Sequence, residues 1–165
     1  MKKIDPIIIG IIVIVLLMVG GVILAYIVSP KEEAKKYSVN DENRPVLEIS
    51  QKEFNFGQMK LDDTKTQKVS IKNIGQSPLL LSDFATSCNC TFVQAVINGK
   101  ESPLFSMHSR PDWQGVLQPD ETGILKLIYE PKLMPVKGSV TRQIVFKTND
   151  PAQPLITLKF TANVE

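Results

Sequence analysis

The sequence predicts an all-β fold: an Ig-like antiparallel β-sandwich preceded by a single N-terminal transmembrane α-helix. Residues 7–28 carry no charged side chain, whereas residues 45–165 consist of short, mostly alternating apolar segments separated by turn residues. No helical pattern of about 10–15 residues lies between these segments, which disfavours a parallel sheet with crossover helices. We expect a short tail over residues 1–6, the transmembrane helix over 7–28, a polar linker over 29–44 and the Ig-like domain over 45–165.

The apolar run from Ile7 to Val28 is 22 residues long. As an α-helix it spans about 33 Å, enough to cross the hydrocarbon core of a bilayer. A cleavable signal peptide has a shorter apolar region, about 7–15 residues, that ends in small residues. Because this run is longer and ends in Tyr26, Ile27 and Val28, the sequence favours an uncleaved anchor.

The rest of the chain is close to neutral. Residues 29–44 are polar and have few large apolar groups, as expected of a linker. Residues 29–165 contain 17 Lys and Arg against 16 Asp and Glu, a net charge of +1, with no basic cluster interleaved with aromatic residues. This composition gives no support to nucleic-acid binding, and no small-molecule substrate site is evident.

Alternation along the predicted strands assigns their faces. The segments ending at 73, 146 and 162 each place one apolar row on the core side, and "EFNFG" is expected to end at Gly57. The 123–129 segment has Ile124, Leu127 and Tyr129 among its apolar members, and Asn98-Gly99 is a turn signal. About six to eight strands in about 120 residues favour a sandwich. The expected core rows are Val69, Ile71 and Asn73; Val140, Arg142, Ile144 and Phe146; and Ile156, Leu158, Phe160 and Ala162.

Cys88 and Cys90 are the only two cysteines of the chain. Two cysteines so close in sequence cannot form the inter-sheet bridge of antibody domains. We expect the pair to lie on one face of a strand, where their Cα atoms are about 6.5–7 Å apart, at or beyond the usual limit for a disulfide. A bond between them therefore requires a local turn. Three interpretations stay open: structural cysteines, ligands of a soft metal, or redox-active thiols.

A copper(I) site is the most specific of the chemical interpretations. Copper(I) accepts thiolate and thioether ligands at low coordination number, whereas structural zinc usually takes four ligands. Met107 and His108 are adjacent in "LFSMHSRPDW", so the predicted donors are Cys88, Cys90, Met107 and His108. Met59 or Met134 could add a further sulfur. No residue obviously orients His108 as a base for a cysteine nucleophile, so we expect no enzymatic activity.

Several motifs in the folded part resemble a bacterial Ig-like family known mainly as a domain of unknown function. That family is related to the β-sandwiches of the abnormal-spindle/hydin and major-sperm-protein type, and the similarity covers nearly all of residues 46–164. The family's usual Ser-Cys-Gly-Cys-Thr motif has Asn89 in place of glycine here, and Asp120 stands where a glycine is common. The motifs are "FNFGQM", "IKNIGQSPLLL", "TSCNCT", "LQPDETGILKLIYEP" and "IVFKTNDP".

The resemblance implies a domain outside the cytoplasm, because family members typically follow a signal peptide or an anchor. We therefore expect the N-terminus in the cytoplasm and the domain in the periplasm or at the cell surface, since the flanking lysines do not decide the orientation. The layout also resembles copper-delivery assembly factors of cytochrome c oxidase, although their Cys-Phe-Cys-Phe motif is absent.

Two functions follow as hypotheses. The first is a membrane-anchored, non-enzymatic module that docks a protein partner in or at the membrane. The second is a membrane-tethered copper(I)-binding protein or metallochaperone.

Overall fold

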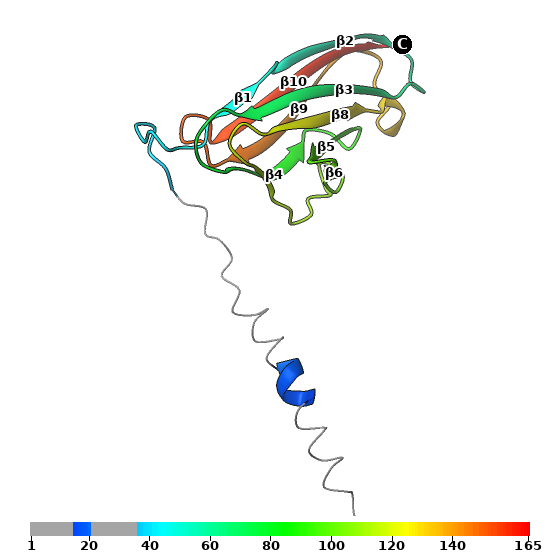
Figure 1. Ribbon diagram of the computed structural model, residues 1–165. Coiled ribbons are helices and arrows are strands. Elements are labelled where there is room, and N and C mark those ends of the chain that lie inside the picture. Colours follow the sequence, from blue (N-terminus) through cyan, green and yellow to red (C-terminus); the bar gives the residue numbers. More distant parts are fainter. Residues whose placement is uncertain (1–14, 21–35) are drawn as a thin grey trace, which may run out of the picture. The chain divides into compact units, whose positions relative to one another are not determined.

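A computed structural model of the protein describes residues 15–20 and 36–165. The chain divides into two compact units, residues 1–33 and 34–165. In the first unit, residues 15–20 are helical (Figure 1). Among the described residues no helix is long and apolar enough to cross a membrane. The expected transmembrane helix over 7–28 lies largely outside the described residues and stays a prediction.

The second unit is a two-layer β-sandwich, as the sequence predicts (Figure 1). One sheet has the strand order β1-β3-β8-β5-β6 and the other β2-β10-β9-β4-β7. A short 3-10 helix, Pro131–Leu133, follows β8. The strands are β1 (Leu47–Ile49), β2 (Glu53–Met59), β3 (Lys65–Asn73), β4 (Leu79–Thr86), β5 (Thr91–Ile97), β6 (Lys100–Glu101), β7 (Gly115–Leu117), β8 (Thr122–Tyr129), β9 (Gly138–Thr148) and β10 (Leu155–Val164).

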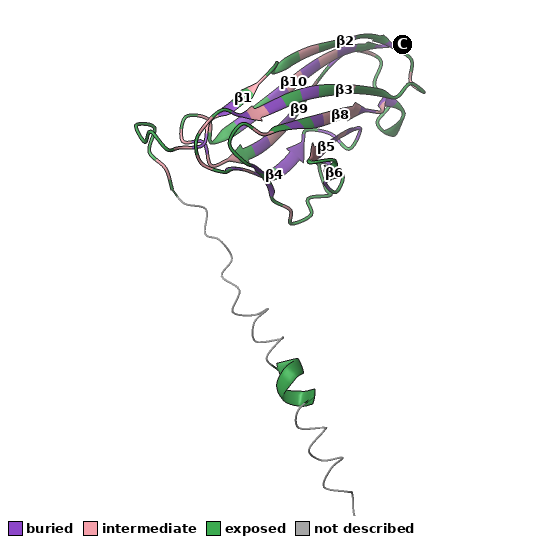
Figure 2. Cartoon of the chain, in the orientation of Figure 1, coloured by how far each residue is buried: buried purple, intermediate pink, exposed green. Residues whose placement is uncertain are grey.

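The core lies between the two sheets, and burial alternates along the long strands (Figure 2). The expected core rows of β3 and β10 are buried throughout, and in β9 only Arg142 of the expected row is not fully buried. Aromatic rings stack across the interior, with Phe56 against Phe160 at 4.3 Å and Phe84 against Phe146 at 4.9 Å between centroids. Stacked aromatic pairs of this kind stabilise a core beyond their buried area.

Four details differ from the sequence-based expectation. The described residues form ten strands rather than six to eight, because β6 and β7, with two and three residues, are too short to show any periodicity. β2 pairs with β10 in parallel, so the sandwich is not purely antiparallel. Gly57 does not end β2 but lies inside it at φ +70°, a conformation that favours glycine. In β8 the buried side chains are those of Leu125, Leu127 and Tyr129, whereas Ile124 is exposed.

The predicted turns are present. Asn98 and Gly99 both have positive φ, +52° and +73°, and join β5 to β6. Asp120 lies at the position where the resembling family often has glycine, and its φ is +64°. Its carboxylate forms an ion pair with the ammonium of Lys72 at 3.3 Å. Aspartate tolerates this left-handed conformation better than most residues, which explains how it replaces glycine there.

The strand register defines two ends of the sandwich. The linker end is where residues 36–46 enter β1, and it contains Asn73 and Asp150. The cysteine end contains Cys88, Cys90 and the loop 131–137, and β9 runs from this end to the linker end over 11 residues. At about 3.3 Å per residue, the two ends are about 35 Å apart. The C-terminus lies toward the cysteine end (Figure 1).

Candidate functional site

Cys88 and Cys90 lie in a tight turn between β4 and β5. The N–H of Thr91 donates to the C=O of Cys88 at 3.2 Å, and the hydroxyl of Thr86 donates to that same carbonyl at 2.9 Å. The hydroxyl also lies 3.0 Å from the C=O of Thr91. These bonds hold both sides of the turn, so the positions of the two cysteines are set by the backbone.

The two cysteines form a disulfide, with their Cα atoms 5.2 Å apart. The expectation that the pair lies on one face of a strand is therefore wrong. The chain turns at Asn89, and the turn brings the Cα atoms into the range that a disulfide requires. The backbone N–H of Cys90 also points at the Sγ of Cys88, at 3.0 Å.

The disulfide adds little to the stability of the fold. In the chain-entropy description, a crosslink stabilises by closing a loop in the unfolded chain, and the gain becomes smaller as the closed loop becomes shorter. For a loop of three residues that description gives about 1.5 kcal/mol, half the value for a 15-residue loop. Crosslinking of distant segments therefore does not account for the presence of this disulfide.

Arg142 of β9 lies against the buried sulfur. Its Nε–H donates to the Sγ of Cys90 at 3.3 Å, and its guanidinium carbon lies 5.9 Å from the ring centroid of Tyr129. The Tyr129 hydroxyl is buried and has no hydrogen-bond partner among the residues that the structure describes. Arg142 thus places a fixed positive charge between an aromatic ring and a sulfur atom.

Met134 covers the other sulfur. Its Sδ lies 3.5 Å from the Sγ of Cys88, while the residue as a whole is 44% exposed. Met134 belongs to the loop 131–137, in which Leu133 and Val136 are also exposed, by 48% and 46%. These three side chains form an exposed apolar patch, hereafter the 133–136 patch, with Lys132 and Lys137 on either side.

The structure brings only part of the predicted copper set together. Cys88, Cys90 and Met134 are in contact, whereas Met107 and His108 are exposed side chains of the turn closed by a hydrogen bond from Ser106 to Ser109. Met59 is a buried core residue at the end of β2. Within residues 15–20 and 36–165, no group of three or more His, Cys, Asp and Glu side chains is arranged to hold a metal.

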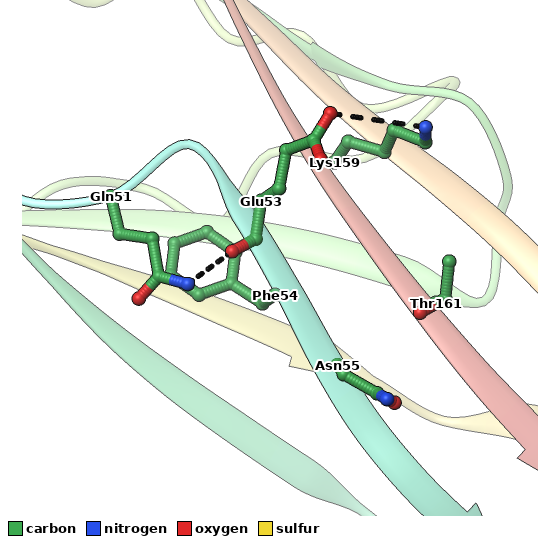
Figure 3. Close-up of a pocket in the computed structure, with 6 residues that line it drawn as sticks. All are labelled: Gln51, Glu53, Phe54, Asn55, Lys159 and Thr161. Carbon is green, nitrogen blue, oxygen red and sulfur yellow. Dashed lines mark hydrogen bonds and ion pairs between the residues drawn. The ribbon is translucent and has the colours of Figure 1, made fainter.

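A shallow pocket lies over β2 and β10, with a volume of about 320 Å³ (Figure 3). Glu53 and Lys159 form an ion pair across it at 3.9 Å, and the side-chain amide of Gln51 donates to the C=O of Glu53. Its charged groups are thus paired with each other. The lining residues are Gln51, Glu53, Phe54, Asn55, Lys159 and Thr161. A polar surface whose charged groups pair with each other is typical of a solvated sheet face.

The edges of the two sheets are poorly suited to pairing with another strand. Three of the four edge strands have only two or three residues. On the longer edge strand, β2, side chains occupy backbone groups: Lys65 donates to the C=O of Phe56, and Asn55 accepts from the N–H of Gly57. Edge strands that are short, or whose backbone groups are already hydrogen-bonded to side chains, resist pairing with a further strand. These features disfavour strand addition at β2, β6 and β7.

Sequence reasoning placed Arg142 on the core-facing side of β9 but assigned it no role. A cation in an otherwise apolar row was the available signal, because charged side chains face a core only when they have a partner there. The partners, Cys90 and Tyr129, come from other strands and could not be read from the alternation. Together, the disulfide, its arginine donor and its methionine cover can support thiol–disulfide chemistry or, when reduced, soft-metal binding.

Comparison with known proteins identifies the fold family. Residues 45–163 match the family model described as HYDIN/CFA65/VesB-like, Ig-like domain. No curated protein sequence matches the chain.

Several solved structures are similar. A protein of unknown function from Porphyromonas gingivalis W83 aligns at TM-score 0.55 and 23% identity, covering 74% of this chain and 49% of that one. The chain therefore spans about half the length of that protein. The PapD-like domain 7 (ASH) of human CEP192 aligns at TM-score 0.49 and 12% identity, covering 84% of this chain and 95% of that one. These similarities concern the fold alone.

Proposed function

Since residues 45–163 make this chain a member of the HYDIN/CFA65/VesB-like Ig-like domain family, we propose that it is a membrane-anchored, extracytoplasmic docking module without enzymatic activity. Its role is to present the cysteine end of the sandwich to a protein partner in or at the membrane. The observation that carries the proposal is the 133–136 patch, three exposed apolar side chains within four residues.

The 133–136 patch differs from other exposed apolar residues of the domain. Single exposed side chains such as Ile74 and Leu155 are ordinary on protein surfaces. In the patch, Leu133, Met134 and Val136 are close in sequence, and Pro131 and Pro135 restrict the backbone that carries them. A restricted loop loses less conformational freedom on binding, which favours its use as a contact surface. A protein partner is favoured over an anionic lipid surface because the net charge of residues 29–165 is only +1.

The anchor part of the proposal rests on the uncharged run over 7–28. Fractionation tests it directly. The full chain should remain with membranes after a high-salt wash, and a chain lacking residues 1–28 should be released. Membrane retention of the truncated chain would show that the domain itself, rather than the run, holds the protein there.

Co-purification tests the docking proposal. The full chain extracted in gentle detergent should retain a protein partner, and the Leu133→Ser/Met134→Ser/Val136→Ser variant should lose it. Leu155→Ser is the matched control, since Leu155 is exposed by 60% at the linker end and should not matter. Recovery of the wild-type chain as a free monomer after chemical cross-linking would contradict docking.

A second candidate, copper(I) binding, is favoured by one contact. Met134 Sδ lies 3.5 Å from Cys88 Sγ, so reduction of the disulfide would leave two thiols and a thioether in one place. Three sulfur donors suit copper(I). Met107 and His108 remain proposed additional donors from an exposed turn.

Anaerobic titration separates these donor sets. The reduced full chain is titrated with copper(I) against a competing chelator. We expect Cys88→Ser/Cys90→Ser to abolish binding and Met134→Leu to weaken it about tenfold. Weakening by His108→Ala would add that residue to the set. Equal copper(I) affinity of the wild type and the double-serine variant would show that these cysteines do not bind copper(I).

A further inference from the structure

We propose that the Cys88–Cys90 disulfide is a reactive centre that exchanges with a dithiol of a partner protein. In this exchange Cys88 is the attacked sulfur and Cys90 leaves as a thiolate on Arg142. The proposal goes beyond docking, since a module that only binds needs no exchangeable disulfide. It rests on three contacts of the turn and on the unequal burial of its two cysteine residues.

Burial selects the attacked sulfur. Cys90 has no exposed surface, whereas Cys88 retains 4%. The group in contact with Cys88 on its outer side is Met134, which is itself 44% exposed. A methionine side chain has flexible torsions and moves aside at little cost. An incoming thiolate therefore reaches Cys88 by displacing one side chain, while Cys90 stays enclosed.

Hydrogen bonds prepare both sulfurs to carry negative charge. The Nε–H of Arg142 lies 3.3 Å from Cys90 Sγ and would stabilise the thiolate that leaves when the S–S bond breaks. The backbone N–H of Cys90, 3.0 Å from Cys88 Sγ, would do the same for the second thiolate. Exchange is faster when the leaving thiolate is stabilised.

The reaction balances as two exchange steps. A thiolate of the partner attacks Cys88 Sγ, the S–S bond breaks, and its electron pair leaves on Cys90 Sγ beside Arg142. The second thiolate of the partner then attacks the partner's own sulfur in the mixed disulfide, and Cys88 leaves as a thiolate. The partner dithiol is thereby oxidised to a disulfide by two electrons, and this pair is reduced by two. The same steps in reverse oxidise the pair.

The first experiment uses the wild-type full chain in detergent. Reduced glutathione is added for a short time, exchange is stopped with acid, free thiols are alkylated and fragment-ion mass spectrometry locates the glutathione. We expect glutathione on Cys88 at least about tenfold more often than on Cys90. Glutathione on Cys90 to an equal or greater extent would overturn the assignment, and so would a disulfide that dithiothreitol reduces only after unfolding.

The second experiment measures the rate of reduction by dithiothreitol in folded variants. Arg142→Gln should slow reduction about tenfold, and Arg142→Lys should restore most of the rate because it keeps the charge. Met134→Ala should accelerate reduction by uncovering Cys88, whereas Met134→Leu, of similar volume, should not. If the Arg142→Gln variant keeps the native circular dichroism and is reduced at a rate within twofold of wild type, Arg142 does not promote the exchange. Both experiments are independent of partner capture, so their failure is distinguishable from failure of docking.

Discussion

The linker end and the cysteine end of the sandwich satisfy their polar groups in different ways. At the linker end, buried Asp150 accepts from Arg44 at 3.1 Å, from Leu47 N–H at 3.0 Å and from Ala152 N–H at 2.9 Å. At the cysteine end, the buried hydroxyl of Tyr129 has no hydrogen-bond partner among the described residues, and the 133–136 patch is exposed. A fully satisfied buried network stabilises a fold, whereas a cluster of exposed apolar side chains can mark an interaction site. We therefore expect the linker end to contribute more to the stability of the fold and the cysteine end to carry the chemistry.

The largest expected effect is at the linker end. Asp150→Ala removes the buried carboxylate and leaves Arg44 and two backbone N–H groups without their acceptor. We expect the free energy of unfolding to fall by about 3–5 kcal/mol, measured by urea denaturation. Lys147→Ala is the control, because its ion pair with Asp83 is exposed and should contribute less than about 1 kcal/mol. Similar losses for the two variants would contradict a stabilising linker end.

Asn73→Ala tests the second buried group of that end. The Asn73 amide donates to the C=O of Leu117 at 2.9 Å and of Ser77 at 2.8 Å, and its oxygen accepts from the N–H of Gly75. Loss of these bonds leaves buried backbone groups unpaired, so we expect a decrease of about 2 kcal/mol in the free energy of unfolding. Asn163→Ala, which removes an exposed side-chain hydrogen bond to Gln58, should change that free energy by less than about 0.5 kcal/mol.

Removal of the disulfide should cost less than either change. Closure of so short a loop accounts for only about 1.5 kcal/mol of the free energy of unfolding. Reduction of the wild type should give a similar loss in the same denaturation measurement. A loss above about 4 kcal/mol would mean that the pair is a structural element and that the contrast between the ends is wrong.

Substitution of the 133–136 patch should leave stability nearly unchanged. The triple serine variant replaces three side chains that are each more than 40% exposed, and Met134 is the one with a contact described above, to Cys88, so the free energy of unfolding should fall by less than about 1 kcal/mol. A large loss would show that the patch packs onto the domain, in which case loss of a partner in the same variant would have a trivial cause.

The smallest effect concerns pH. The pKa of the Glu101 carboxyl is lowered by its hydrogen bond to Lys126 and by the charge of that ammonium. A carboxyl with a lower pKa in the folded chain contributes stability above its unfolded pKa, and loses it as the pH falls through the folded pKa. Glu101→Gln should therefore slightly flatten the acid limb of a stability–pH curve, a small effect because the pair is solvent-exposed. An unchanged or steeper acid limb would contradict the ion pair.

The sequence predicted the features that depend on local periodicity. Alternation identified the core face of β3 and β10, and Asn98-Gly99 identified a turn, because each signal lies within a few neighbouring residues. Features that depend on distant contacts were missed. The parallel pairing of β2 with β10 joins strands about 100 residues apart, and the two-residue β6 has no period to detect.

The candidate site was predicted only in its composition. The Cys-x-Cys spacing singled out the right residues, but alternation carried through them predicted a strand where the backbone turns at Asn89. Met134 was named as one of several possible donors, and only the packing of the 131–137 loop selects it. Arg142 reaches Cys90 from a strand 52 residues away, a contact that no local pattern encodes.

Site-specific photo-cross-linking tests most directly whether the cysteine end is the one that contacts a protein partner. A photoreactive amino acid is placed at Leu133 in one full-length chain and at Leu155 in another, and each is irradiated in native membranes. Both positions are exposed and apolar, but they lie at opposite ends of the sandwich. We expect a discrete cross-linked partner from position 133 and none from position 155. A partner captured from position 155 alone would place docking at the linker end and contradict docking at the cysteine end.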